Sequence, residues 1–172
     1  MQTALMLGAG STPCMRRIKG PDSASEVDTK WTTLDINDSA KPDHVFDLND
    51  LENSSPVPGG PYDEIHAYEI LEHYGRQGDY RGFFTGFRRL HKALVPNGLF
   101  FLTVPQEDTT WGDPGHCRSI QAVTLAFLVE DHYKQLGRTR CTDYRKFVAP
   151  YWWKIEEFQY KGPSLEAAMR AV

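Results

Sequence analysis

The sequence is poor in cysteine, in long apolar runs and in net positive charge, and each absence excludes a class of protein. Its three cysteines, Cys14, Cys117 and Cys141, form no CxxC pair, which argues against a disulfide framework or a structural zinc site. No apolar run approaches the roughly 20 residues that cross a bilayer. The N-terminal MQTALMLGAG lacks the flanks of a signal peptide. We therefore expect a cytoplasmic protein with no membrane partner.

The charge and length narrow the class further. A formal net charge of -4 excludes a uniformly basic surface for nucleic acid, but it leaves a local basic patch, and so a nucleic-acid partner, open. The composition, 40% hydrophobic and 24% charged, is typical of a soluble globular protein. The 172 residues suit a single domain over residues 1–172. Nothing in the sequence indicates an oligomeric state.

Short apolar segments alternate with polar or helical connections along the chain. Strands are predicted at residues 3–7, 31–36, 45–46, 62–68 and 99–104, and helices at residues 79–94 and 120–130. Two further strands, at residues 144–148 and 152–160, would form a hairpin. This order predicts an α/β fold: a Rossmann-like open sheet, mostly parallel with an antiparallel C-terminal hairpin, and helices on both faces.

Three strand ends carry residues suited to a nucleoside. The first predicted strand ends in Gly8-Ala9-Gly10, the second in Asp35 and the third in Asp47. Glycines let a backbone approach a ligand closely, and an acidic residue after the second strand can accept the hydroxyls of a ribose. Each feature alone is common in α/β proteins, but their order along the chain predicts a ribose-bearing cofactor across the strand ends.

The phosphate-binding signals of other nucleotide folds are missing. Pro13 stands where a GxGxxG motif would place its third glycine, and no segment matches GxxxxGK[ST]. The polar, broken stretch after Pro13 is a poor helix for holding a pyrophosphate. An NAD-dependent enzyme is therefore disfavoured.

Five segments occur in the motif order of a known family. They are LMLGAG, TLDI, HVFDLND, YDEIHAYEILEHYG and LHKALVPNGLFFLTVP, within residues 3–105. In this order they resemble class I S-adenosylmethionine-dependent methyltransferases, and EILEHYG and LVPNGLFFLTVP are the most specific pieces. The later WGDPGHCRSI and CTDYR resemble small methyltransferases of bacteriophages and prophages. The resemblance implies a methyltransferase whose cofactor is S-adenosylmethionine.

The resemblance also implies cofactor-binding roles at four strand ends. The residues are Gly8, Ala9, Gly10, Asp35, Ile36, Asp47, Leu48, Tyr68 and Glu69. The glycine turn would pass under the methionine part, and the second strand end would hold the ribose and pack on the adenine. At the end of the third strand, Asp47 and Leu48 would face the edge of the adenine. At the end of the fourth strand, Tyr68 and Glu69 would close the floor of the cofactor site.

The acceptor is less defined by the sequence. The fourth strand is followed by EILEH and not by [DNS]PP[YFW], which disfavours exocyclic amines of DNA bases, and Pro13-Cys14 is misplaced for a cytosine C5 nucleophile. We therefore expect the methyl group to be transferred to an oxygen or nitrogen of a small-molecule, sugar or nucleotide acceptor. The alternative is a degenerate, non-catalytic fold that binds the cofactor or serves as a partner subunit.

Two histidines are the candidate catalytic residues. His116, in the loop after the fifth strand, and His73 could each take the proton of an acceptor. Glu69, Glu72, His73 and His116 also copy a ligand spacing of some metal-dependent O-methyltransferases, which suggests magnesium, manganese or zinc. The same ExxEH spacing occurs in metal-free relatives, so acceptor-site or structural roles stay open.

Overall fold

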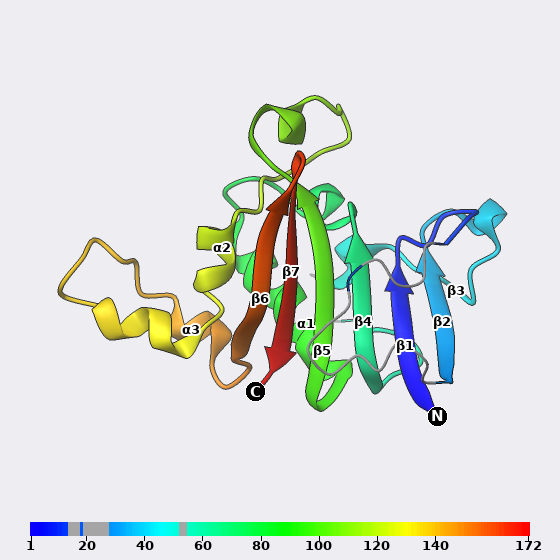
Figure 1. Ribbon diagram of the computed structural model, residues 1–172, viewed down its shortest axis with the longest axis horizontal. Coiled ribbons are helices and arrows are strands. Elements are labelled where there is room, and N and C mark those ends of the chain that lie inside the picture. The colour runs from blue at the N-terminus through cyan, green and yellow to red at the C-terminus, as the bar shows by residue number, and fades with distance from the viewer. Residues whose placement is uncertain (14–17, 19–27, 52–54) are drawn as a thin grey trace.

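The computed structural model describes residues 1–13, 18, 28–51 and 55–172. The described strands form a seven-stranded sheet in the order β3-β2-β1-β4-β5-β7-β6 (Figure 1). They are β1 (Gln2–Leu7), β2 (Thr29–Asp35), β3 (His44–Val45), β4 (Tyr62–Tyr68), β5 (Leu94–Pro105), β6 (Trp153–Lys161) and β7 (Ser164–Ala171). β1 to β5 are parallel, while β7 is antiparallel to both β5 and β6. The predicted Rossmann-like sheet with an antiparallel C-terminal hairpin is confirmed.

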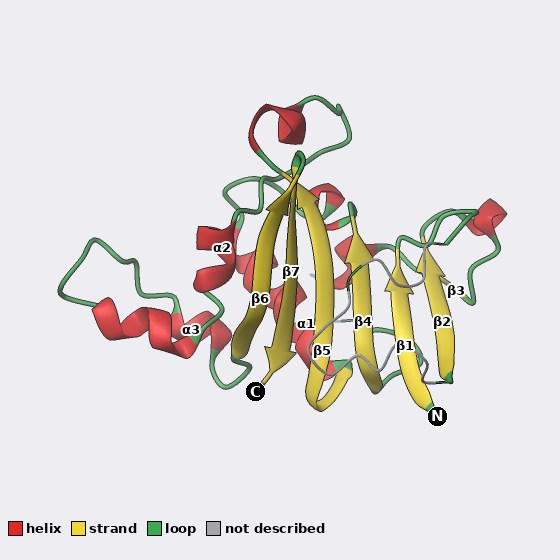
Figure 2. Cartoon of the chain, in the orientation of Figure 1, coloured by secondary structure: helices red, strands yellow, loops and turns green. Residues whose placement is uncertain are grey.

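The described helices are α1 (Tyr80–Lys92), α2 (Ala122–Ala126) and α3 (Arg145–Val148), together with five 3₁₀ turns. In Figure 2, α1 lies behind the sheet, across β5 and β7. The crossover between β1 and β2, where a helix on the second face would lie, falls in residues 14–27, of which only Ile18 is described. None of the described helices is long and apolar enough to cross a membrane.

Helix α1 confirms the predicted helix over residues 79–94. Asp79 caps its start, since the carboxylate Oδ1 accepts a hydrogen bond of 3.0 Å from the backbone N–H of Gly82. Phe83, Phe87 and Leu90 recur at helical spacing and are buried against the sheet. The helix therefore covers the face of β5 on which Phe100 lies, since Phe87 packs against that ring.

Strand β5 is central, as its continuous apolar run predicts. Phe100, Phe101 and Leu102 are each 0% exposed. Phe100 packs with the residues of α1, whereas Phe101 packs on the opposite face with Leu99 and Ala168. Both faces of β5 are thus covered, which explains the lack of polar alternation.

The C-terminal third departs from the sequence-based prediction. The strand predicted at residues 144–148 is wrong: this segment is the short helix α3. Its rings pack on α1, with Tyr144 5.2 Å and Phe147 6.0 Å from Phe84 between ring centroids. The hairpin partner of β6 is instead β7, whose sequence SLEAAMRA is rich in helix formers. Pairing with β5 and β6 on its two sides overrides that local propensity.

The helix predicted at residues 120–130 is also shorter than expected, since α2 spans only Ala122–Ala126. The carbonyl oxygen of Leu128 accepts a hydrogen bond of 3.1 Å from the N–H of Trp153. Trp153 is 1% exposed and packs on Phe87 and Phe100, so it is a core residue. The carbonyl of Leu128 thus pairs with the start of β6, and the helix does not continue to residue 130.

The strand order reverses beside β1, because β2 pairs with one edge of β1 and β4 with the other. In open parallel sheets, ligands bind at the carboxyl ends of the strands at such a switch point. The carboxyl ends of β1, β2 and β4 are therefore where a site is expected.

Candidate functional site

The turn after β1 requires glycine at two positions. Gly8 and Gly10 both have a φ of 59°, which residues with a side chain rarely adopt. A Cβ on Gly8 would lie 2.6 Å from Cδ1 of Ile70, whereas a Cβ on Gly10 would meet no atom within 4 Å. Glycine is thus required at position 8 by both conformation and space, and at position 10 by conformation alone.

Asp35, at the end of β2, joins two turns. Its Oδ2 accepts a hydrogen bond of 2.7 Å from the N–H of Gly10, and its Oδ1 accepts one of 2.8 Å from the N–H of Asn37. The residue is 8% exposed. Because each carboxylate oxygen has two acceptor positions, both oxygens retain capacity for a further donor such as a hydroxyl.

A cavity opens beside these turns, and we call it the strand-end cavity. The residues that line it are Gly8, Leu34, Asp35, Ile36, Phe46, Asp47, Leu48, Asn49, Ile70 and His73. Ile36 is 65% exposed, which is unusual for an isoleucine and leaves an apolar surface ready for contact. Apolar walls with two carboxylates suit a flat ring joined to a hydroxyl-bearing group.

The cavity gathers five of the nine residues predicted to bind cofactor: Gly8, Asp35, Ile36, Asp47 and Leu48. Ala9, Gly10, Tyr68 and Glu69 are not among its described lining residues. At the end of β4, Ile70 lines the cavity, while Tyr68 bonds on the opposite face of the sheet. Glu69 has a φ of 52°, and its N–H donates to the carbonyl oxygen of Thr103 at 2.9 Å.

Strand β4 carries a buried polar chain that the sequence motifs do not single out. Oε2 of Glu64 lies 2.9 Å from Nε2 of His66, and Nδ1 of His66 lies 2.7 Å from the hydroxyl of Tyr68. Gln2 donates to the other oxygen of Glu64 at 2.8 Å. Polar residues at alternate positions of YDEIHAY share one face of a strand, and this spacing is the signal that could have found the chain. It orients Tyr68 at the carboxyl end of β4.

Glu72, His73 and His116 converge in what we call the Glu–His–His cluster. Their potential ligand atoms all lie within 4.8 Å of one another. Glu72 and His73 belong to the 3₁₀ turn after β4, and His116 belongs to the loop after β5. The two imidazole rings meet edge to face, with centroids 4.7 Å apart. Glu69, the fourth predicted metal ligand, is not part of this cluster.

Backbone carbonyls fix the tautomers of both histidines. Nδ1 of His116 lies 2.6 Å from the carbonyl oxygen of Thr110, and Nδ1 of His73 lies 3.1 Å from that of Gly115. A carbonyl oxygen only accepts, so in each ring Nδ1 carries the hydrogen. The neutral rings therefore present the lone pair of Nε2, and in His116 this atom is 3.8 Å from Oε1 of Glu72.

Glu72 is the most perturbed group of the site. The pKa of its carboxyl is raised from 4.5 to about 7, mainly by burial and in smaller part by nearby Glu69, while His116 acts in the lowering direction. The residue is 1% exposed, and its Oε2 has no hydrogen-bond partner among the described residues. The carboxyl thus changes its charge near neutral pH, as a group in a proton-transfer site does.

The loop that carries His116 is anchored to the turn after β4. The carbonyl oxygen of Glu72 accepts hydrogen bonds from the N–H groups of Cys117, at 2.7 Å, and Arg118, at 3.1 Å. The N–H of Gln77 donates to the carbonyl oxygen of Cys117 at 2.8 Å. These bonds hold His116 over His73.

The donor set of the cluster fits a divalent metal. Two Nε2 lone pairs and one buried carboxylate form a two-histidine, one-carboxylate set, which is common for first-row metals. The Nδ1–H groups of His73 and His116 donate to carbonyls, as the outer nitrogens of metal-bound histidines usually do.

No protein-family model matches the sequence, and no curated protein is significantly similar to it. Solved structures, however, match almost the whole chain. An S-adenosylmethionine-dependent methyltransferase from Archaeoglobus fulgidus aligns with a TM-score of 0.58 at 13% identity, covering 98% of this chain and 86% of that one. The fold is that of S-adenosylmethionine-dependent methyltransferases.

Two more of these methyltransferase structures cover 99% of this chain. The N-methyltransferase NodS from Bradyrhizobium japonicum WM9 has a TM-score of 0.51 and 15% identity, with 85% of its own chain covered. The 1,6-didemethyltoxoflavin-N1-methyltransferase from Burkholderia thailandensis, with S-adenosylhomocysteine bound, has a TM-score of 0.55 and 15% identity, with 71% covered.

Proposed function

We propose that this chain transfers a methyl group from S-adenosylmethionine to an oxygen or nitrogen of a small-molecule, sugar or nucleotide-type acceptor. The observation that carries the proposal is the strand-end cavity, which sits at the switch point of a methyltransferase fold. The Glu–His–His cluster adjoins this cavity, because His73 belongs to both.

The cofactor would lie along the carboxyl ends of the first four strands. Asp35 would accept the ribose hydroxyls with the lone pairs that Gly10 and Asn37 leave open. Ile36 would pack on the adenine ring, and Asp47 would accept from its amine beside the backbone of Leu48. The turn from Gly8 to Gly10 would pass under the methionine part, with Tyr68 and Glu69 supporting the floor behind Ile70.

Calorimetry with S-adenosylmethionine, S-adenosylhomocysteine and NAD tests the cofactor. We expect binding of the first two and none of NAD. A carboxylate that holds a ribose contributes roughly 1.5–3 kcal/mol, so Asp35→Ala should weaken S-adenosylmethionine binding at least tenfold while circular dichroism stays unchanged. Asp38→Ala, an exposed carboxylate three residues further along, is the matched control. Unchanged affinity in folded Asp35→Ala rejects the assignment.

The histidines supply the proton acceptor in this proposal. Bound S-adenosylmethionine supplies an electrophilic methyl group on its sulfonium. Nε2 of His116 would take the proton that the acceptor atom loses when it receives this methyl group. Ionised Glu72, 3.8 Å away, stabilises the resulting imidazolium. His73 is the next residue able to take the proton.

A divalent metal held by Glu72, His73 and His116 is the other use of the same cluster. It would occupy the Nε2 lone pairs and the unpartnered Glu72 oxygen, and it would orient an acceptor oxygen. Dialysis against a chelator, followed by elemental analysis and an activity assay, separates the two uses. Stoichiometric metal that is lost together with activity supports the metal, while full activity without metal leaves the histidines as proton acceptors.

The alternative is a non-catalytic fold that binds the cofactor or serves as a partner subunit. Pro13, in place of the third motif glycine, favours it. A screen of tritiated methyl transfer against small metabolites, sugars and nucleic acids distinguishes the two. Tight S-adenosylhomocysteine binding with no transfer to any acceptor class supports the alternative.

A further inference from the structure

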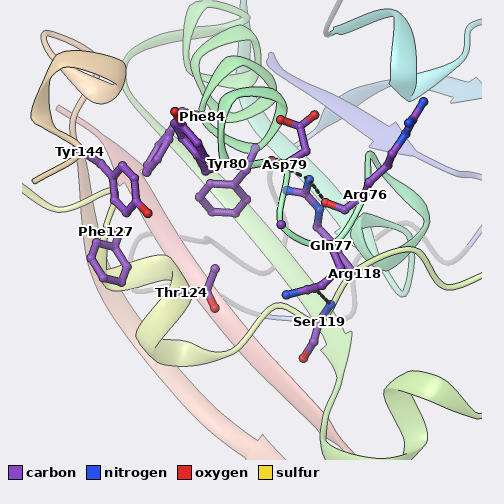
Figure 3. A pocket seen from close by; sticks show the side chains of 12 residues that line it. Arg76, Gln77, Asp79, Tyr80, Phe84, Arg118, Ser119, Thr124, Phe127 and Tyr144 are labelled. Carbon is purple, nitrogen blue, oxygen red and sulfur yellow. Dashed lines mark hydrogen bonds between the residues drawn. The ribbon is translucent and has the colours of Figure 1, made fainter. Parts of the chain in front are cut away.

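A second cavity, of about 240 Å³, lies between the start of α1, α2 and the segment that precedes α3. We call it the aromatic cavity. In Figure 3, the rings of Tyr80, Phe84, Phe127 and Tyr144 lie on one side, and Gln77 and Ser119 lie on the other. The cavity thus has a wall of rings facing a wall of hydrogen-bonding groups.

The four rings of this wall pack on one another. Tyr144 is its centre, with ring centroids 5.2 Å from Phe84, 5.4 Å from Tyr80 and 5.6 Å from Phe127. These separations are typical of stacked and edge-to-face aromatic pairs. Tyr80 is 39% exposed and offers ring surface to solvent. A planar ligand would add to this cluster without rearranging it.

The opposite wall offers donors. Oε1 of Gln77 accepts a hydrogen bond of 3.0 Å from the N–H of Ser119, which fixes the amide, and the amide nitrogen bonds no described residue. Arg118 is 4% exposed and donates from Nη2 to the carbonyls of Arg76, at 2.9 Å, and Asp79, at 3.2 Å. The Arg118 guanidinium also lies over the rings of Tyr74 and Phe83, so its role is to hold the turn before α1. The amide nitrogen of Gln77 is the donor that suits an oxygen or ring nitrogen on the edge of a flat ligand.

The size limits the ligand. A volume of about 240 Å³ lies just below the range typical of pockets for drug-sized ligands, which suits a small ligand of one or two fused rings.

The aromatic cavity is joined to the Glu–His–His cluster. Gln77, in its polar wall, bonds the carbonyl of Cys117, which follows His116 in the chain. Arg118, in the same wall, bonds the carbonyl of Glu72. Both bonds join backbone atoms, so they fix the segment of the polar wall relative to the segments that carry Glu72 and His116.

We propose that the aromatic cavity binds a planar aromatic or heteroaromatic compound of one or two fused rings with a hydroxyl or ring nitrogen. This inference goes beyond the proposed function, because the aromatic cavity shares no described lining residue with the strand-end cavity or with the Glu–His–His cluster.

The test uses the full chain saturated with S-adenosylhomocysteine and a generic probe, 2-naphthol, with its saturated counterpart decahydro-2-naphthol for comparison. Dissociation constants are measured by calorimetry. We expect 2-naphthol to bind at least tenfold more tightly than the saturated alcohol. Tyr80→Ala should weaken 2-naphthol binding about two- to twelvefold, which is the contribution of one aromatic contact. Tyr160→Ala, which removes an exposed tyrosine from β6, should change nothing.

Three results overturn the inference: no binding of 2-naphthol, equal binding of both alcohols, or equal affinities in Tyr80→Ala and the wild type. Its failure is distinguishable from failure of the proposed function, because S-adenosylhomocysteine binding is measured separately. Ring binding that depends on Tyr80 in a chain that does not bind S-adenosylhomocysteine would retain an aromatic site and reject the methyltransferase.

Discussion

Replacing Glu72 with glutamine should change how the stability of the protein depends on pH. Burial raises the pKa of this carboxyl from 4.5 to about 7, so between these values the folded state binds a proton that the unfolded state has lost. A raised carboxyl pKa means that the free energy of unfolding falls as pH rises through this window. Glutamine has the same shape and no charge, so Glu72→Gln lacks this contribution.

The magnitude follows from the two pKa values. One pKa unit corresponds to about 1.4 kcal/mol, and most of the difference of about 2.5 units is expressed between pH 5 and pH 8. Wild-type protein should therefore lose about 2–3 kcal/mol of unfolding free energy over this range relative to Glu72→Gln.

Urea unfolding at pH 5, 6, 7 and 8, with chelator present, measures the effect. Glu157→Gln, an exposed glutamate on β6, is the matched control and should follow the wild type. Parallel pH profiles of wild type and Glu72→Gln would refute the assignment of a raised pKa. Adding manganese or zinc without chelator gives a second readout: a metal bound to ionised Glu72 should restore wild-type stability at pH 8 and leave Glu72→Gln unaffected.

Two further predictions concern the glycine turn and the proton acceptor. Gly8→Ala should lower the melting temperature more than Gly10→Ala, because both share a φ of 59° but only the first places a Cβ 2.6 Å from Ile70; equal losses in thermal melts would contradict the steric argument. His116→Ala should cut turnover at least a hundredfold, since a general base contributes about 10²–10⁴-fold, with little change in S-adenosylmethionine affinity by calorimetry. Persistent turnover would move the role to His73, and collapsed affinity would place His116 in the cofactor pocket or the fold.

The strands and the long helix in the N-terminal two thirds of the fold could be predicted because local sequence patterns determine them. The apolar run of β5 and the helical spacing of Phe83, Phe87 and Leu90 are set by which faces are buried. The site residues at strand ends follow from topology, since the parallel pairing of β1 and β2 brings Gly10 into hydrogen-bond contact with Asp35, 25 positions further along the chain.

The secondary structure of the C-terminal third was harder to predict because it depends on pairing between segments that are distant in sequence. The segment of β7 forms a strand because it pairs with β5 and β6 on its two sides. Residues 144–148 are helical, and the Tyr144 ring packs against Phe84 of α1. The alternate spacing of Glu64, His66 and Tyr68 places them on one face of β4, but the burial of that face depends on strands and side chains distant in sequence, so the hydrogen-bonded chain was not predicted. The aromatic cavity likewise joins segments more than 60 residues apart in sequence.

The position of β7 between β5 and β6 has a consequence for the order of events as the chain is synthesised. β6 emerges from the ribosome before β7, yet it reaches the sheet only through β7. The edge of β5 that pairs with β7 therefore stays unpaired until both β6 and β7 have been synthesised. The short turn at Gly162-Pro163 lets the two strands pair with each other first, and the completed hairpin then adds to β5 as one unit. Until that step, β5 is an apolar edge strand, so nascent chains that end between residues 105 and 164 should be the forms most prone to aggregate or to recruit chaperones.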